Sequence, residues 1–118
     1  MSGTFEKVAI TGFVVLLGIL MYTDFARGAG SDIIITEIGA YEATGHEWVE
    51  IYNRGGAAVD VTGWKFWENG TNHGLTLKRG NDMLIAPGEY VVVAQDDENF
   101  MADYPSVLAK VFDSSWGT

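Results

Sequence analysis

The chain of 118 residues contains no cysteine. A disulfide framework, a zinc–thiolate site and a thiol nucleophile are therefore all excluded. The chain must be stabilised by core packing and strand pairing, or by something outside its own residues, such as bound calcium or a neighbouring domain.

Basic residues are also scarce. Seven Lys and Arg stand against sixteen Asp and Glu, which gives a formal net charge of −9. The first thirty residues contain two of each kind, so the rest of the chain carries the whole net charge. Nucleic-acid binding depends on clustered Lys and Arg, whereas the basic residues beyond this segment are scattered: Arg54, Lys65, Lys78, Arg79 and Lys110. We therefore expect no nucleic-acid partner.

Aromatic residues, in contrast, are plentiful, with four Trp, five Tyr and six Phe. This content is typical of a packed globular domain rather than a disordered chain. Without the N-terminal segment, about 90 residues remain, which is enough for the core of one small domain.

The N-terminal segment is the longest apolar stretch of the chain. Val8 to Tyr22 is a run of fifteen residues without a charge, shorter than the ~20 residues that cross a bilayer as a helix. The length is typical of a signal peptide, and small residues allow cleavage after Gly28, with Ala26 at −3, or after Gly30. An uncleaved membrane anchor and a buried core helix are the alternatives. We expect residues 1–30 to be a signal peptide or anchor, a hydrophobic helix with a short hinge, and the protein to be exported, either secreted or membrane-anchored.

Two strands are predicted after this segment. Residues 33–38 are rich in isoleucine on both faces, a pattern that favours a strand buried on both sides or at a sheet crossing. Residues 47–53 alternate, with Val49 and Ile51 on the face that we expect to meet the core.

Four sequence elements follow one another in a characteristic order. They are Ile-Ile-Ile-Thr-Glu-Ile at 33–38, Glu-Trp-Val-Glu-Ile-Tyr-Asn at 47–53, Val-Thr-Gly-Trp at 61–64, and Leu-Ile-Ala-Pro-Gly-Glu-Tyr-Val-Val-Val at 84–93. The order resembles the lamin tail domain. The resemblance implies an all-β, immunoglobulin-like β-sandwich over residues 31–118, used for attachment, with no catalytic residues. It also implies that Trp64, which follows Gly63, anchors the core.

The remaining core and turn residues come from local patterns. Alternation places Phe66 on the side of Trp64, and the valine-rich strand contributes Val91 and Val93 to the core. Asn69-Gly70-Thr71-Asn72 predicts a hairpin connection, with a strand around residues 75–77. Pro87 and Gly88 predict a type II turn that pairs residues 83–86 with residues 90–94.

The last third predicts a short helix and an incomplete sandwich. Asp96 is suited to the N-cap of a helix that Pro105 ends, and residues 107–112 begin another strand. Members of the family continue with further strands, so we expect the last strands to be lacking. An exposed edge and self-association would follow.

No group of residues predicts catalysis or a metal site. The segment beginning at His46 resembles the zinc-protease motif, but Glu50 stands where the second histidine is required, and the segment is a strand. A metal site at His46 and His73 would need a third converging ligand. Residues 96–98 are read as a helix cap and solvated charge, with weak calcium contact left open.

Two further motifs have simple explanations. Ser114-Ser115 lacks a paired histidine and a nucleophile elbow. Asn69-Gly70-Thr71 matches a glycosylation sequon but is explained by turn geometry. We therefore predict no catalytic, cofactor-binding or metal-binding residue.

The expected function is that of a non-enzymatic, exported binding or structural module that attaches to a protein or a cell-envelope component. The alternative is an accessory domain of a larger exported enzyme, a nuclease or phosphoesterase, since lamin tail domains of prokaryotes accompany such enzymes. The sequence beyond Thr118 would separate the two.

Overall fold

The computed structural model describes residues 32–40 and 42–117. The predicted export segment, residues 1–30, lies outside them. Within the described residues, no helix is long and apolar enough to cross a membrane.

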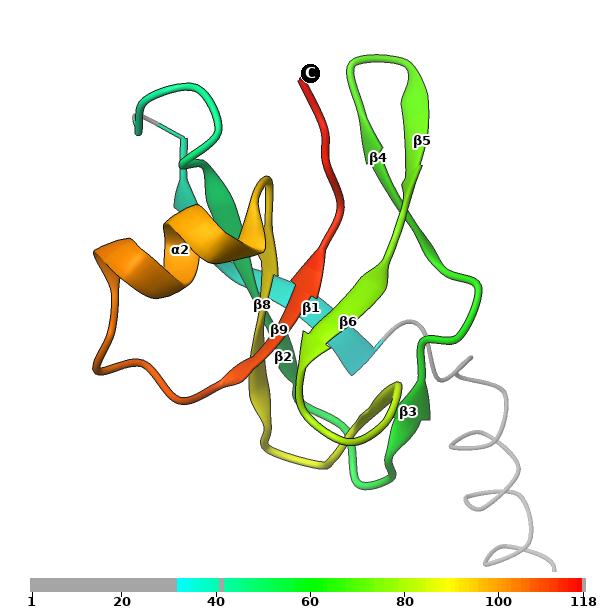
Figure 1. Cartoon of the computed structure of the whole chain (residues 1–118). Helices are drawn as coiled ribbons and strands as arrows, with labels where there is room; N and C mark the ends of the chain where they lie inside the picture. Colours follow the sequence, from blue (N-terminus) through cyan, green and yellow to red (C-terminus); the bar gives the residue numbers. More distant parts are fainter. Residues whose placement is uncertain (1–31, 41, 118) are drawn as a thin grey trace, which may run out of the picture. The chain divides into compact units, whose positions relative to one another are not determined.

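The described part of the chain folds into nine strands and one helix (Figure 1). In chain order they are β1 (Ile33–Gly39), β2 (Trp48–Asn53), β3 (Val59–Asp60), β4 (Lys65–Glu68), β5 (Thr71–Gly74), β6 (Thr76–Arg79), β7 (Leu84–Ile85), β8 (Tyr90–Ala94), α2 (Asp97–Asp103) and β9 (Lys110–Asp113).

Five of the strands form the main sheet, in the order β1-β2-β8-β9-β6. Neighbours are antiparallel except β8 and β9, which run parallel and are connected through α2. The last strand, β9, lies inside this sheet, between β8 and β6. The two edges of the main sheet are therefore β1 and β6.

The second layer consists of two small sheets, β3-β7 and β4-β5. The main core lies between the layers and contains Val49, Val59, Val61, Ile85, Val91, Val93, Phe112 and Trp116. The predicted all-β, immunoglobulin-like β-sandwich is thus confirmed.

The helix α2 covers the opposite face of the main sheet. Successive residues of a strand point to opposite faces, so β8 directs Val91 and Val93 into the sandwich and Val92 and Ala94 toward the helix. Phe100 of α2 completes this smaller core. Because both faces of β8 are covered, its residues 91–94 are continuously apolar and buried.

The helix begins where the sequence predicts. The Asp96 side chain accepts a hydrogen bond from the backbone N–H of Asn99 at 3.0 Å, as an N-cap does. The backbone N–H of Tyr104 donates to the carbonyl of Phe100 at the other end, and Pro105 follows.

The predicted Asn-Gly hairpin is present, but its second strand begins earlier than expected. Asn69 and Gly70 both have positive φ, +46° and +79°, as a type I′ turn requires. β5 starts at Thr71 rather than near Leu75. Leu75 separates β5 from β6, so this part of the chain passes from the small layer into the main sheet.

The prediction that residues 83–86 pair with residues 90–94 is wrong. β7 pairs with β3, whereas β8 pairs with β2 and β9. The turn itself is formed: Gly88 has φ +76°, and the N–H of Glu89 donates to the carbonyl of Ala86. The turn connects two different sheets, because β7 lies in the small β3-β7 sheet and β8 in the main sheet. The buried Asn53 of β2 holds β7 against the main sheet, since its side-chain amide donates to the Ile85 carbonyl at 2.9 Å.

The prediction that residues 33–38 are buried on both faces is also wrong. β1 is an edge strand, and the side chains of Ile35 and Ile38 are 55% and 60% exposed. Apolar residues on both faces of a strand do not distinguish a central strand from an edge strand, because only pairing with distant residues decides its position.

Candidate binding surface

The predicted core residues lie in or against the main core. Val49, Val91 and Val93 are buried, whereas Ile51, Trp64 and Phe66 are partly buried and pack against the same cluster. Trp64 therefore contributes a partly covered side chain at the border of the core. Of the predicted turn residues, Gly63 has φ +76° and, like Pro87 and Gly88, is exposed.

The sequence interpretation missed Trp116, which closes the sandwich near the end of the described chain. Its ring packs on Phe66 with a centroid distance of 4.7 Å, and only 5% of the residue is exposed. The carbonyl of Trp116 accepts from Nε2 of the buried Gln95 at 2.5 Å, and its Nε1 donates to Glu47. The sequence feature that could have indicated this role is a large aromatic residue just after the last predicted strand.

The edge strand β1 carries two exposed apolar side chains, Ile35 and Ile38. Its only hydrogen-bonded neighbour among the described strands is β2. A β-bulge between Ile35 and Glu37 leaves Thr36 as the extra residue. The hydroxyl of Thr36 donates to Oε1 of Glu50 at 2.7 Å, so the bulge is fixed by a side-chain contact to β2.

Two carboxylates lie directly opposite each other beside the bulge. The register pairs Glu37 of β1 with Glu50 of β2, and like charges at paired positions destabilise a sheet. Glu37 is exposed and Glu50 partly buried. Neither forms an ion pair with any lysine, arginine or histidine of the described residues.

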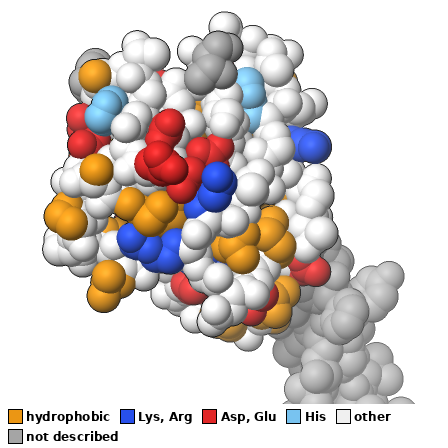
Figure 2. Space-filling view, in the orientation of Figure 1, with side chains coloured by type: hydrophobic (Ala, Val, Ile, Leu, Met, Phe, Trp, Pro, Cys, Tyr) orange, Lys and Arg blue, Asp and Glu red, His pale blue; other side chains and the backbone are white. Residues whose placement is uncertain are grey.

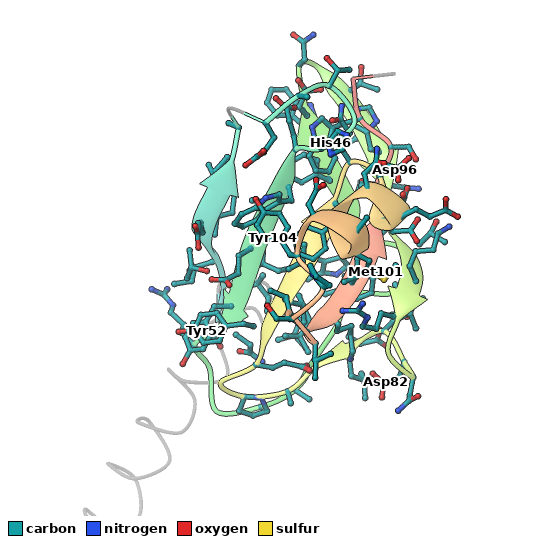
Figure 3. All side chains as sticks on the ribbon, turned by 60° about the vertical axis from the view of Figure 1, so that its left-hand side comes forward. His46, Tyr52, Asp82, Asp96, Met101 and Tyr104 are labelled. Carbon is teal, nitrogen blue, oxygen red and sulfur yellow. The ribbon has the colours of Figure 1, made fainter. Side chains whose placement is uncertain are left out.

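An aromatic pair lies farther along β2, at the end of the main sheet away from the helix. Tyr52 and Tyr90 are paired in the register of β2 and β8, and their ring centroids are 4.4 Å apart. Tyr90 is 49% exposed. Figure 3 shows Tyr52 at the end of the sheet that α2 does not cover.

The other end of β1 is held by an aromatic cluster. An added Cβ at Gly39 would lie 2.4 Å from Nε1 of Trp48, so the indole lies against the Gly39 backbone. The Trp48 ring contacts Phe100 and Tyr104 edge-on, at centroid distances of 5.9 and 5.6 Å. Trp48 thereby connects the edge strand to α2.

The loop before β2 is fastened to α2 by polar contacts. Nδ1 of His46 lies 2.5 Å from Oδ2 of Asp103, and the side-chain amide of Asn99 donates to the Gly45 carbonyl at 3.0 Å. The hydrogen bond to Asp103, with further help from the charges of Asp103, Asp96 and Glu42, raises the pKa of His46 above 6.5. Figure 3 shows His46, Asp96 and Tyr104 along the side of the molecule where the helix lies.

The other chemically active side chains are not assembled into a metal site. Within residues 32–40 and 42–117, no group of three His, Asp, Glu or Cys side chains could hold a metal ion. Nε2 of His73 is buried without a hydrogen-bond partner, 3.7 Å from Oε2 of Glu68. Ser115 donates from its hydroxyl to Asp113.

Two of the lysines contact acidic side chains. Nζ of Lys78 lies 3.3 Å from Oδ1 of Asp97, and Nζ of Lys110 lies 2.8 Å from Oδ1 of Asp82. Figure 2 shows acidic side chains next to basic ones on the visible face, with separate apolar patches. These contacts leave no broad basic surface among the described residues on that face.

A comparison with known families gives a match over most of the chain. The family described as Lamin Tail Domain matches residues 26–117. Searches of curated proteins and of solved structures gave no match.

Proposed function

Because the chain belongs to the lamin tail domain family, we propose that it is a non-enzymatic, exported binding or structural module that attaches to a protein or to a component of the cell envelope. The family's fold is immunoglobulin-like, and such sandwiches present their edges and loops to partners.

The observation that carries this proposal is the exposed edge strand β1. A long apolar edge is an aggregation hazard that soluble proteins usually protect. Here Ile35 and Ile38 are more than half exposed on a strand of seven residues. Covering this strand with a partner would remove both the apolar exposure and the unpaired backbone groups.

Export is supported by the sequence. The uncharged run from Val8 to Tyr22 and the small residues that follow it are typical of a signal peptide or a membrane anchor.

Cell fractionation tests the export part of the proposal. The full chain with a C-terminal tag should be found outside the cytoplasm, either in the membrane fraction or in the medium. Recovery of the uncleaved chain in the soluble cytoplasmic fraction would contradict export.

Sedimentation with isolated cell envelopes of the source organism tests attachment. The purified chain should sediment with them, and the double variant Ile35→Lys/Ile38→Lys should sediment less. The variant Leu108→Lys is a control, because Leu108 is 83% exposed and lies in the loop before β9. Equal sedimentation of all three proteins would show that β1 is not the attachment site.

A further inference from the structure

We propose that the outer edge of β1 binds an extended, basic peptide segment of a partner protein, which adds to the main sheet as a sixth strand. This inference rests on the proposed binding function and specifies the chemistry of the partner. It combines three properties of β1: a free backbone edge, two exposed isoleucines and an acidic pair without a cation.

The free backbone edge provides the hydrogen bonds. In an antiparallel pair, the backbone N–H and C=O groups of alternate residues point away from the partner strand. β1 pairs with β2 on one side, and no described strand pairs with it on the other. Adding an extended peptide to such an edge is a common mode of recognition, in which main-chain hydrogen bonds provide affinity and side chains provide specificity.

The isoleucines define the side chains that the peptide carries on one face. Ile35 pairs with Ile51 and Ile38 with Val49 in the register of β1 and β2. Both partners belong to or pack on the main core, so Ile35 and Ile38 extend that apolar face outward. A peptide with apolar residues at alternate positions would continue it.

The acidic pair defines the side chains that the peptide carries on its other face. Glu37 and Glu50 are paired across β1 and β2, on the side of the sheet that carries α2. Their repulsion is relieved when a lysine or arginine of an added strand lies beside Glu37. The peptide therefore has basic residues at the positions between its apolar ones.

The charge also argues against a second copy of this chain as the occupant. Each copy has a formal net charge of −9 and the same acidic pair. Pairing two β1 edges would bring these like charges together, whereas a basic peptide neutralises them.

The test uses the full chain and short labelled peptides that alternate valine with lysine. Fluorescence anisotropy should show saturable binding of this peptide. Binding should be weaker for a peptide with glutamate in place of lysine, and lost for a lysine peptide N-methylated at alternate backbone amides. Equal binding of the lysine and glutamate peptides, or full binding of the N-methylated peptide, would overturn the proposal.

Reversing a charge on the protein tests whether the peptide binds at β1. Glu37→Lys should weaken binding of the lysine peptide by roughly tenfold, because an attraction becomes a repulsion, and should strengthen binding of the glutamate peptide. Glu98→Lys makes the same change of charge at an exposed position of α2 near Lys78 and should have little effect. Equal effects of the two variants would overturn the assignment to β1.

The circular dichroism of both variants should match that of the parent chain, and light scattering should show a monomer before peptide is added. A dimer that Glu37→Lys alters would contradict the peptide proposal in favour of a second copy. If the envelopes bind the chain and its Glu37→Lys variant equally, while the lysine peptide does not bind, the proposed attachment function survives and the basic-peptide inference fails.

Discussion

The two edges of the main sheet differ in length, charge and the way in which they are covered. β6 has four residues, includes Lys78 and Arg79, and is interrupted by a bulge between Leu77 and Arg79. The Arg79 guanidinium donates to the Val107 carbonyl at 2.6 Å, and Lys78 contacts Asp97 of α2. β1 has seven residues, no lysine or arginine, and exposed isoleucines.

Short length, lysine and bulges are the features by which sheet edges avoid pairing with other chains. β6 combines all three, whereas β1 has only the bulge at Thr36. The same sheet therefore protects one edge against pairing and leaves the other open. This difference supports β1 as the place where a partner strand adds.

The largest difference in the free energy of unfolding is expected between a substitution in the core beside β6 and a substitution of an exposed side chain of β1. Phe112 of β9 is fully buried, and Phe112→Ala should lower the free energy of unfolding by about 3–5 kcal/mol. Ile38→Ala should lower it by less than about 1 kcal/mol, because its side chain is mostly exposed. Urea unfolding measures both. Similar losses would show that Ile38 is covered in solution and that β1 is not open.

The attachment of β1 to the rest of the sheet is tested at Gly39. A methyl group there would overlap the Trp48 indole, so Gly39→Ala should cost about 1–3 kcal/mol by displacing the ring. Gly56→Ala is the control, since a Cβ at that position would meet no atom within 4 Å. If both variants unfold at the same urea concentration, the indole does not hold this end of β1.

The predictions made from sequence depend on how local the responsible interactions are. The Asn69-Gly70 turn, the Pro87-Gly88 turn and the Asp96 cap were predictable, because each is determined by neighbouring residues. The sandwich depends on contacts between residues far apart in the chain, and it was predicted only from the resemblance to the family. Local patterns could not show that β7 pairs with β3 rather than with β8, because residues 84–85 pair with residues 59–60, about 25 residues earlier in the chain.

The candidate binding surface was less predictable for a related reason. The sequence Ile-Ile-Ile is compatible with a central strand or with an exposed edge, and only the pairing order distinguishes them. The opposition of Glu37 and Glu50 follows from the register, which the bulge at Thr36 shifts by one residue. A one-residue shift changes every opposing pair, so the acidic pair is visible only in the structure.

An effect of comparable size is expected when the protection of β6 is weakened. Arg79→Met keeps much of the apolar stem but removes the hydrogen bond to Val107, at a cost of about 1–3 kcal/mol for a bond from a charged donor. Amide exchange should become faster in β6, with little change in β1. Faster exchange in both edges alike would indicate general destabilisation and would not support independent protection of β6.

The smallest effect concerns the loop between β1 and β2. Its His46 has a raised pKa, so its contact with Asp103 adds stability that is fully present below pH 6.5 and is lost as the pH rises through the raised value. The melting temperatures of the parent and His46→Gln should therefore differ more at pH 5.5 than at pH 9. A difference that does not change with pH would contradict a charged contact.

Hydrogen exchange of the full chain, with and without the alternating valine–lysine peptide, tests the open edge most directly. We expect the peptide to protect amides at alternate residues of β1, those that point away from β2, and to leave the amides of β6 unchanged. Protection in β6, or no added protection in β1 at saturating peptide, would contradict the claim that β1 is the open edge of this sheet.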